Sequence, residues 1–91
     1  MNDKVILESL AMDLKRVALG FHRGSMSVAE RFIKEALKRK GELDVKSLEP
    51  YVQKLIFKME KSLKDSDNQK RAEDALMYST LFQNAALKVN D

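Results

Sequence analysis

The sequence predicts an all-α fold, a small antiparallel four-helix bundle that is expected to be dimeric. Apolar residues recur at three- and four-residue spacing along four segments, the pattern of helices that bury one face. No segment alternates apolar and polar residues with a period of two, so no strand is predicted. Breaks between the segments are short, which favours antiparallel neighbours. We therefore expect one all-helical domain over residues 1–91, with helices at about 3–20, 28–40, 48–64 and 67–88.

The first two helices have clear boundaries. The helix at 3–20 begins at Asn2 or Asp3 and is expected to end at Gly20 or Gly24, since glycine tolerates the left-handed conformation past a helix end. Its apolar stripe is Leu7, Leu10, Ala11, Leu14, Val17, Ala18 and Phe21. For the helix at 28–40, Ser27 and Glu30 are predicted to form a capping box, and Gly41 closes it. Its stripe is Ala29, Phe32, Ile33, Ala36 and Leu37.

The third and fourth helices are also marked at their starts. Ser47 is the predicted N-cap of the helix at 48–64, and Pro50 in the first turn lacks only an N–H that would be unpaired there. The stripe of that helix is Leu48, Val52, Leu55, Ile56, Met59 and Leu63. Ser66 and Gln69 are predicted to form a second capping box, at the start of the helix at 67–88.

The fourth helix differs from the others because its apolar residues cover more than half of its circumference. They are Ala75, Leu76, Met77, Tyr78, Leu81, Phe82, Ala85, Ala86 and Leu87. Such a helix is buried on more than one side, and this one is shorter than the roughly 20 apolar residues that span a bilayer. It is either the centre of the bundle or a seam between subunits. One stripe from each other helix covers two faces poorly, so we expect a homodimer or another protein partner at Met77, Tyr78, Leu81, Phe82 and Ala85.

The composition excludes several classes of function. There is no Cys, which removes disulfides, thiolate metal sites and a Cys nucleophile, and is compatible with the cytoplasm, where we expect the protein to act. Acidic residues interrupt the N-terminal 13 residues, so no signal peptide is expected. A single His and three Gly leave neither a metal-ligand cluster nor a glycine-rich phosphate loop. We expect no metal, no cofactor, no membrane partner and no catalytic residue.

Two surface patches are candidates for binding. On the third helix, Phe57 lies opposite the buried stripe among Lys54, Lys58 and Lys61, where it could anchor a protein partner or stack on a base. The net charge is +3, and residues 28–41 hold five basic and two acidic residues. Candidate phosphate contacts on that helix are Arg31, Lys34, Lys38 and Arg39. Cations in its last turn also complement the helix dipole, which explains part of this pattern without a ligand.

Arg16 and His22 form an Arg-x5-His pattern whose spacing resembles that of HEPN ribonucleases, which are also small helical bundles. In that family the pattern lies on the last long helix with polar residues between the two. Here it ends the first helix, and the residues between are Val17, Ala18, Leu19, Gly20 and Phe21. The leading hypothesis is therefore a small non-catalytic protein-binding or regulatory protein that acts through helix surfaces. A nucleic-acid-binding module using the second helix is the alternative, and a nuclease-like enzyme resting on Arg16 and His22 is third.

Overall fold

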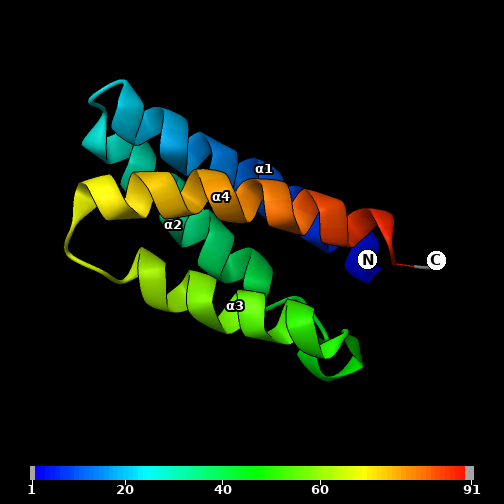
Figure 1. Ribbon diagram of the computed structural model, residues 1–91. Helices are drawn as coiled ribbons and strands as arrows, with labels where there is room; N and C mark the ends of the chain where they lie inside the picture. The colour runs from blue at the N-terminus through cyan, green and yellow to red at the C-terminus, as the bar shows by residue number, and fades with distance from the viewer. Residues whose placement is uncertain (1, 90–91) are drawn as a thin grey trace.

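A computed structural model describes residues 2–89 and shows an all-helical bundle (Figure 1). The helices are α1 (Asp3–His22), α2 (Met26–Lys40), α3 (Pro50–Leu63) and α4 (Asn68–Leu87), and a short 3₁₀ helix, η1 (Val45–Ser47), precedes α3. Residues 2–89 contain no strand. The predicted all-α class is confirmed, and so is the packing of the helices into a bundle.

The helices are arranged around α1, which packs against both α2 and α4. In Figure 1, α1 and α4 lie side by side along most of their length, and α2 passes behind α4. The remaining helix, α3, packs mainly against α4 and less against α2. The first residues of α1 and the last of α4 lie at the same end of the bundle. Asn2 and Val89 accordingly line the same surface hollow.

The helix at the centre of the core is α1 rather than α4. Its predicted stripe is buried from Leu7 to Val17, with Ile6 and Asp13 also buried, while Ala18 and Phe21 are half-buried. By contrast, α4 buries one broad face and leaves Leu76, Met77 and Leu87 exposed. The all-round apolar character of α4 is therefore not matched by all-round burial in the monomer.

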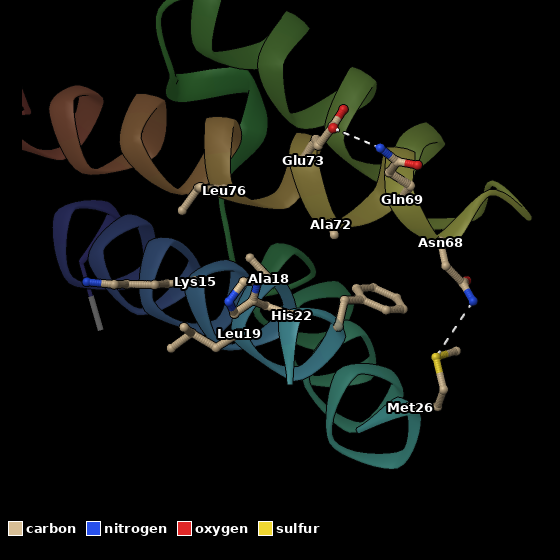
Figure 2. Close-up of a pocket in the computed structure, with 11 residues that line it drawn as sticks. Lys15, Ala18, Leu19, His22, Met26, Asn68, Gln69, Ala72, Glu73 and Leu76 are labelled. Carbon is tan, nitrogen blue, oxygen red and sulfur yellow. Dashed lines mark hydrogen bonds between the residues drawn. The ribbon is translucent and has the colours of Figure 1, made fainter. Parts of the chain in front are cut away.

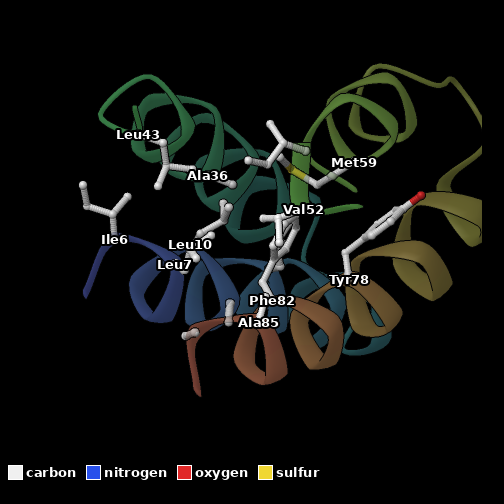
Figure 3. Packing of buried hydrophobic residues seen from close by; sticks show 14 of the residues in the cluster. Ile6, Leu7, Leu10, Ala36, Leu43, Val52, Met59, Tyr78, Phe82 and Ala85 are labelled. Atoms are coloured by element: carbon white, nitrogen blue, oxygen red, sulfur yellow. The ribbon is translucent and has the colours of Figure 1, made fainter. Parts of the chain in front are cut away.

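All four helices contribute to one apolar core (Figure 3). Phe82 of α4 is 0% exposed, and its ring lies 6.3 Å from that of Tyr78, whose hydroxyl points away from the cluster. Around it are side chains from the other helices, including Leu7, Leu10, Ala36, Val52 and Met59. Full burial of a side chain such as Phe82 contributes roughly 1.5–3 kcal/mol.

The helix starts differ from the predicted caps. Ser25, not Ser27, caps α2 by accepting a hydrogen bond from Val28 N, so α2 begins two residues early. Asp67, not Ser66, caps α4, because its carboxylate accepts from Gln69 N and Lys70 N at 3.0 and 3.2 Å. Ser47 lies in η1 instead of capping α3, and its hydroxyl donates to Asp3 Oδ2 at 2.9 Å. At α4 a carboxylate, the stronger acceptor, has taken the position expected of a serine. At α3 the N-cap residue is Glu49, whose side chain forms no capping hydrogen bond.

Gly20 and Gly24 have separate roles at the turn between α1 and α2. Gly24 has a φ of 74°, in the left-handed region, and of the two it is the one that follows the end of α1. Gly20 lies inside α1, where a Cβ would stand 2.8 Å from Ala29 N and 3.0 Å from Ala29 Cα. The missing side chain of Gly20 therefore lets the start of α2 approach α1 closely.

We predict that Gly20→Ala destabilises the protein by about 1–2 kcal/mol. Overpacking costs roughly 1–3 kcal/mol, and we expect the upper part of that range because the closest atoms are backbone atoms that cannot move aside. The better helix propensity of Ala returns about 1 kcal/mol of this cost. Urea unfolding followed by circular dichroism measures the change. Because the closest atoms of Ala29 are backbone, Ala29→Gly should not rescue the variant. A stable Gly20→Ala protein, or full rescue by Ala29→Gly, would contradict the close approach.

Candidate functional site

A surface hollow lies along the seam between α1 and α4, and we call it the α1/α4 groove (Figure 2). Its volume is about 510 Å³, within the usual range for binding pockets. It is lined by the second half of α1, the start of α2 and the first half of α4. The lining residues are Lys15, Ala18, Leu19, Phe21, His22, Met26, Asn68, Gln69, Ala72, Glu73 and Leu76.

Small side chains create the hollow. Ala18 of α1 and Ala72 of α4 are both half-buried residues on this seam, and neither fills the space between the helices. Phe21 lines the groove, and the Arg71 guanidinium lies 5.0 Å from the centre of its ring. Arg71 also donates to Glu30 Oε1 at 2.9 Å and to Leu63 O at 3.4 Å. Arg71 thus joins α4 to α2 and to the end of α3. These contacts hold Arg71 in place against Phe21 of the groove.

The two rims of the groove carry different charges. Lys15 and His22 lie on the α1 side, and Glu73 lies on the α4 side, where Gln69 Nε2 donates to Glu73 Oε1 at 3.5 Å. Within residues 2–89, Lys15 forms no ion pair. The rims therefore present a cation on one side and a carboxylate on the other.

Exposed apolar side chains surround the groove and continue beyond it. Leu19, Met26 and Leu76 are exposed at its edges, and Leu76 has 55% of its surface open to solvent. A second hollow of about 310 Å³ continues along the same seam, shares Lys15 and exposes Met12. An apolar strip of this kind, bordered by polar groups, is typical of an interaction surface.

Most of the side chains predicted to form an oligomer interface are inside the monomer. Tyr78, Phe82 and Ala85 belong to the core of the bundle. Leu81 is half-buried, and only Met77 is exposed. The face that we assigned to a subunit seam is covered by the chain's own helices, so Tyr78, Phe82 and Ala85 are not available to a second copy. Sequence reasoning missed the groove because Leu19, Met26 and Leu76 come from three helices.

The predicted phosphate contacts on α2 are only partly free. Arg31, Lys34 and Lys38 are exposed, and the Arg31 guanidinium lies 5.5 Å from the centre of the Phe32 ring. Arg39 is instead engaged by two carboxylates, with Nε 3.7 Å from Asp13 Oδ2 and Nη1 3.5 Å from Glu42 Oε2. A phosphate at Arg39 would therefore compete with carboxylates already in place.

Asp13 is a buried charge that the sequence analysis did not identify. It is 4% exposed, and its Oδ1 lies 3.5 Å from Arg16 Nη1. Within residues 2–89, neither Asp13 Oδ2 nor Arg39 Nε has a hydrogen-bond partner. Burial raises the pKa of the Asp13 carboxyl above its ordinary value, and the charges of Arg39 and Arg16 only partly oppose this. The sequence pattern that could have identified this buried charge is an acidic residue, Asp13, within the apolar stripe of α1 and three residues before Arg16.

The structure does not bring Arg16 and His22 together. Arg16 contacts Asp13 and lies 5.4 Å from the centre of the Phe32 ring, towards α2. His22 lines the α1/α4 groove, about 9 Å further along α1 by helical rise. In the third candidate patch, Phe57, Lys54, Lys58 and Lys61 all lie exposed on α3. Among residues 2–89, no three His, Asp or Glu side chains gather into a possible metal site.

None of the helices within residues 2–89 combines the length and the apolar character needed to cross a membrane.

We predict that Asp13→Asn leaves the protein at least as stable at pH 7, with a gain of up to about 1 kcal/mol, because burial of the Asp13 charge is only partly offset and Arg39 keeps Glu42 as a partner. A raised pKa means that the folded state holds the proton more tightly than the unfolded state does. The stability of the natural protein therefore falls as pH rises from below 3.8 through the folded pKa. Asn has no ionisable group, so the variant lacks this pH-dependent loss of stability. Urea unfolding of both proteins at about pH 3 and pH 7 should show the difference only at the higher pH. If Asp13→Asn is clearly less stable than the natural protein at pH 7 but equally stable at pH 3, the ion pair between Asp13 and Arg39 is net stabilising, which would contradict the prediction.

Comparison with known proteins gives no match to a family model, to a curated protein or to a solved structure. The candidate site is therefore assigned from its own geometry and chemistry. On those grounds the α1/α4 groove is the surface best suited to binding, because it combines a hollow, exposed apolar side chains and opposite charges on its rims.

Proposed function

We propose that this protein is a small non-catalytic binding or regulatory protein that works as a homodimer through the α1/α4 groove. The exposed apolar side chains at the groove, Leu19, Met26 and Leu76, are the observation that carries the proposal. The lack of cysteine is compatible with the reducing cytoplasm in which we expect the protein to act.

We also infer that neighbouring helices of the bundle run antiparallel. For α1 and α4, two contacts support this course. Arg71 in the first turn of α4 lies against Phe21 near the end of α1, and the Ser79 hydroxyl, further along α4, donates to Ala11 O at 2.7 Å. Residues later in α4 therefore contact residues earlier in α1, as in an antiparallel pair.

Charge complementarity favours a second copy of this chain as the occupant. With a two-fold axis along the groove, α1 of one copy would face α4 of the other. Lys15 and His22 of one copy would then lie towards Gln69 and Glu73 of the other, and the apolar edges would meet between them. Two such contacts form at once, because the two-fold axis repeats each of them.

The size of the chain also supports association. A domain of 91 residues buries a smaller fraction of its surface than larger domains do, so an added interface has a large relative effect on stability. The two hollows on the α1/α4 seam extend from Glu8 to His22, about 21 Å by helical rise. Burial of the exposed parts of Met12, Leu19 and Leu76 over that length would contribute the hydrophobic centre of an interface.

We predict that Leu76→Asp converts the dimer into a monomer, because a carboxylate would be desolvated at the centre of the interface. Light scattering on a sizing column should give twice 10.4 kDa for the natural chain and 10.4 kDa for the variant.

Leu87→Asp is the matched control, since Leu87 is 74% exposed on the same helix but lies outside the groove. This variant should remain dimeric. A natural chain that is monomeric at every concentration would contradict the proposal, and so would a dimer that tolerates Leu76→Asp but not Leu87→Asp.

A further inference from the structure

Phe57 projects from the outer face of α3, on a part of the surface separate from the α1/α4 groove. Its side chain is free, with 69% of the residue's surface exposed. A hollow of about 350 Å³ borders it, lined by Pro50, Gln53, Lys54, Phe57 and Lys58. Apart from Pro50, the other residues that line this hollow are polar or charged. Phe57 is therefore the one aromatic residue that lines this hollow, and its neighbours there are one proline and three side chains with polar or charged end groups.

The surroundings of Phe57 carry a surplus of positive charge. Lys54, Lys58 and Lys61 are exposed, and none of them forms an ion pair within residues 2–89. They recur at four- and three-residue spacing, so they lie on one side of α3 over about 10 Å of its length.

The nearest carboxylate does not neutralise these lysines. Glu60 is the only acidic residue between Pro50 and Leu63, and its Oε2 lies 3.2 Å from Lys40 Nζ and 3.7 Å from Lys64 Nζ. The hydrogen bond from Lys40 holds the pKa of the Glu60 carboxyl below its usual value, so it stays ionised and engaged at neutral pH. Since Lys40 belongs to α2, this contact also brings the basic end of α2 to the edge of the same surface.

We propose that this face of α3 binds single-stranded nucleic acid, with the Phe57 ring stacked on a base and Lys54, Lys58 and Lys61 on the phosphates. Stacking needs only one free ring face and contributes about 1–3 kcal/mol per base. An acidic protein partner fits less well, because protein interfaces surround an aromatic anchor with apolar contacts that exclude water. A duplex also fits less well, because its bases are already stacked on one another and cannot receive the ring.

The small number of contacts predicts weak binding that depends strongly on salt. For single strands the logarithm of the binding constant falls with the logarithm of salt concentration by about 0.7 per phosphate contact. Three lysines therefore predict a slope of about −2. The site does not depend on the proposed dimer, because none of its residues lines the α1/α4 groove.

Fluorescence anisotropy of a labelled oligothymidine of about 20 nucleotides, long enough to cover typical single-strand sites, tests the proposal. Phe57→Ala should weaken binding about tenfold, which corresponds to the loss of one stacked base. Phe57→Tyr keeps an aromatic ring and should bind as the natural chain does. Phe57→Leu has no ring to stack on a base and should bind as weakly as Phe57→Ala. Leu87→Ala, which shortens an exposed apolar side chain on α4, is the control and should change nothing.

A second pair of variants isolates the charge. Lys58→Glu and Lys4→Glu change the net charge equally, but Lys4 is on α1 and lines neither the α1/α4 groove nor the hollow at Phe57. Only Lys58→Glu should weaken binding strongly and reduce the salt slope by about 0.7. The dimer-breaking variant Leu76→Asp should bind the oligonucleotide normally, which keeps this result separate from the test of the α1/α4 groove.

Three results would overturn the proposal. The first is no binding at low salt, or binding that Phe57→Ala leaves unchanged. The second is equal weakening by Lys58→Glu and Lys4→Glu, which would indicate a general charge effect. The third is affinity for a duplex of the same length that equals or exceeds that for the single strand. If labelled polyglutamate binds in a Phe57-dependent way and the oligonucleotide does not, the face belongs to an acidic protein segment instead.

Discussion

The close contact between α1 and α2 at Gly20 is the constraint on which the rest of the structure depends. Because Gly20 has no side chain, the backbone of Ala29 comes within contact distance of α1, and α2 starts immediately beside it. The Asp13–Arg39 ion pair then joins the far end of α2 to the middle of α1. In this position α2 covers one side of α1, and α4 covers much of what remains. The α1/α4 groove lies along the seam where α4 packs on α1.

The sequence predicted the helices well because their apolar stripes are regular. The residues from Leu7 to Val17 on α1, and most of the α3 stripe from Val52 to Leu63, are buried as their spacing indicated. Helix starts were predicted less well, because Ser25 and Ser27, or Ser66 and Asp67, are chemically similar caps one or two residues apart. The choice between them depends on how the preceding turn leaves the last helix, as at Gly24, and this is a tertiary effect.

The candidate site could be predicted only in part. Periodicity places Phe57 and its lysines on an outer face, because all of them lie on one helix. It could not identify the α1/α4 groove, which depends on three helices, nor the pairing of Asp13 with Arg39 across two. It also misjudged α4, since an apolar residue such as Leu76 looks the same in a sequence whether it is enclosed or exposed. Pattern thus indicates which side chains can be buried, whereas topology decides which of them are.

The position of the two chain ends has a consequence for how the bundle could be joined to other proteins. Asn2 and Val89 lie beside one hollow, at the end of the bundle opposite to the turn between α1 and α2. A few added residues could therefore connect them, and a circularly permuted chain opened between α3 and α4 would keep every helix intact. Any domain fused at either end would also stand at that end, away from the turn between α1 and α2. The bundle can thus be attached to another protein at the end with Asn2 and Val89, while the end with the turn between α1 and α2 stays accessible.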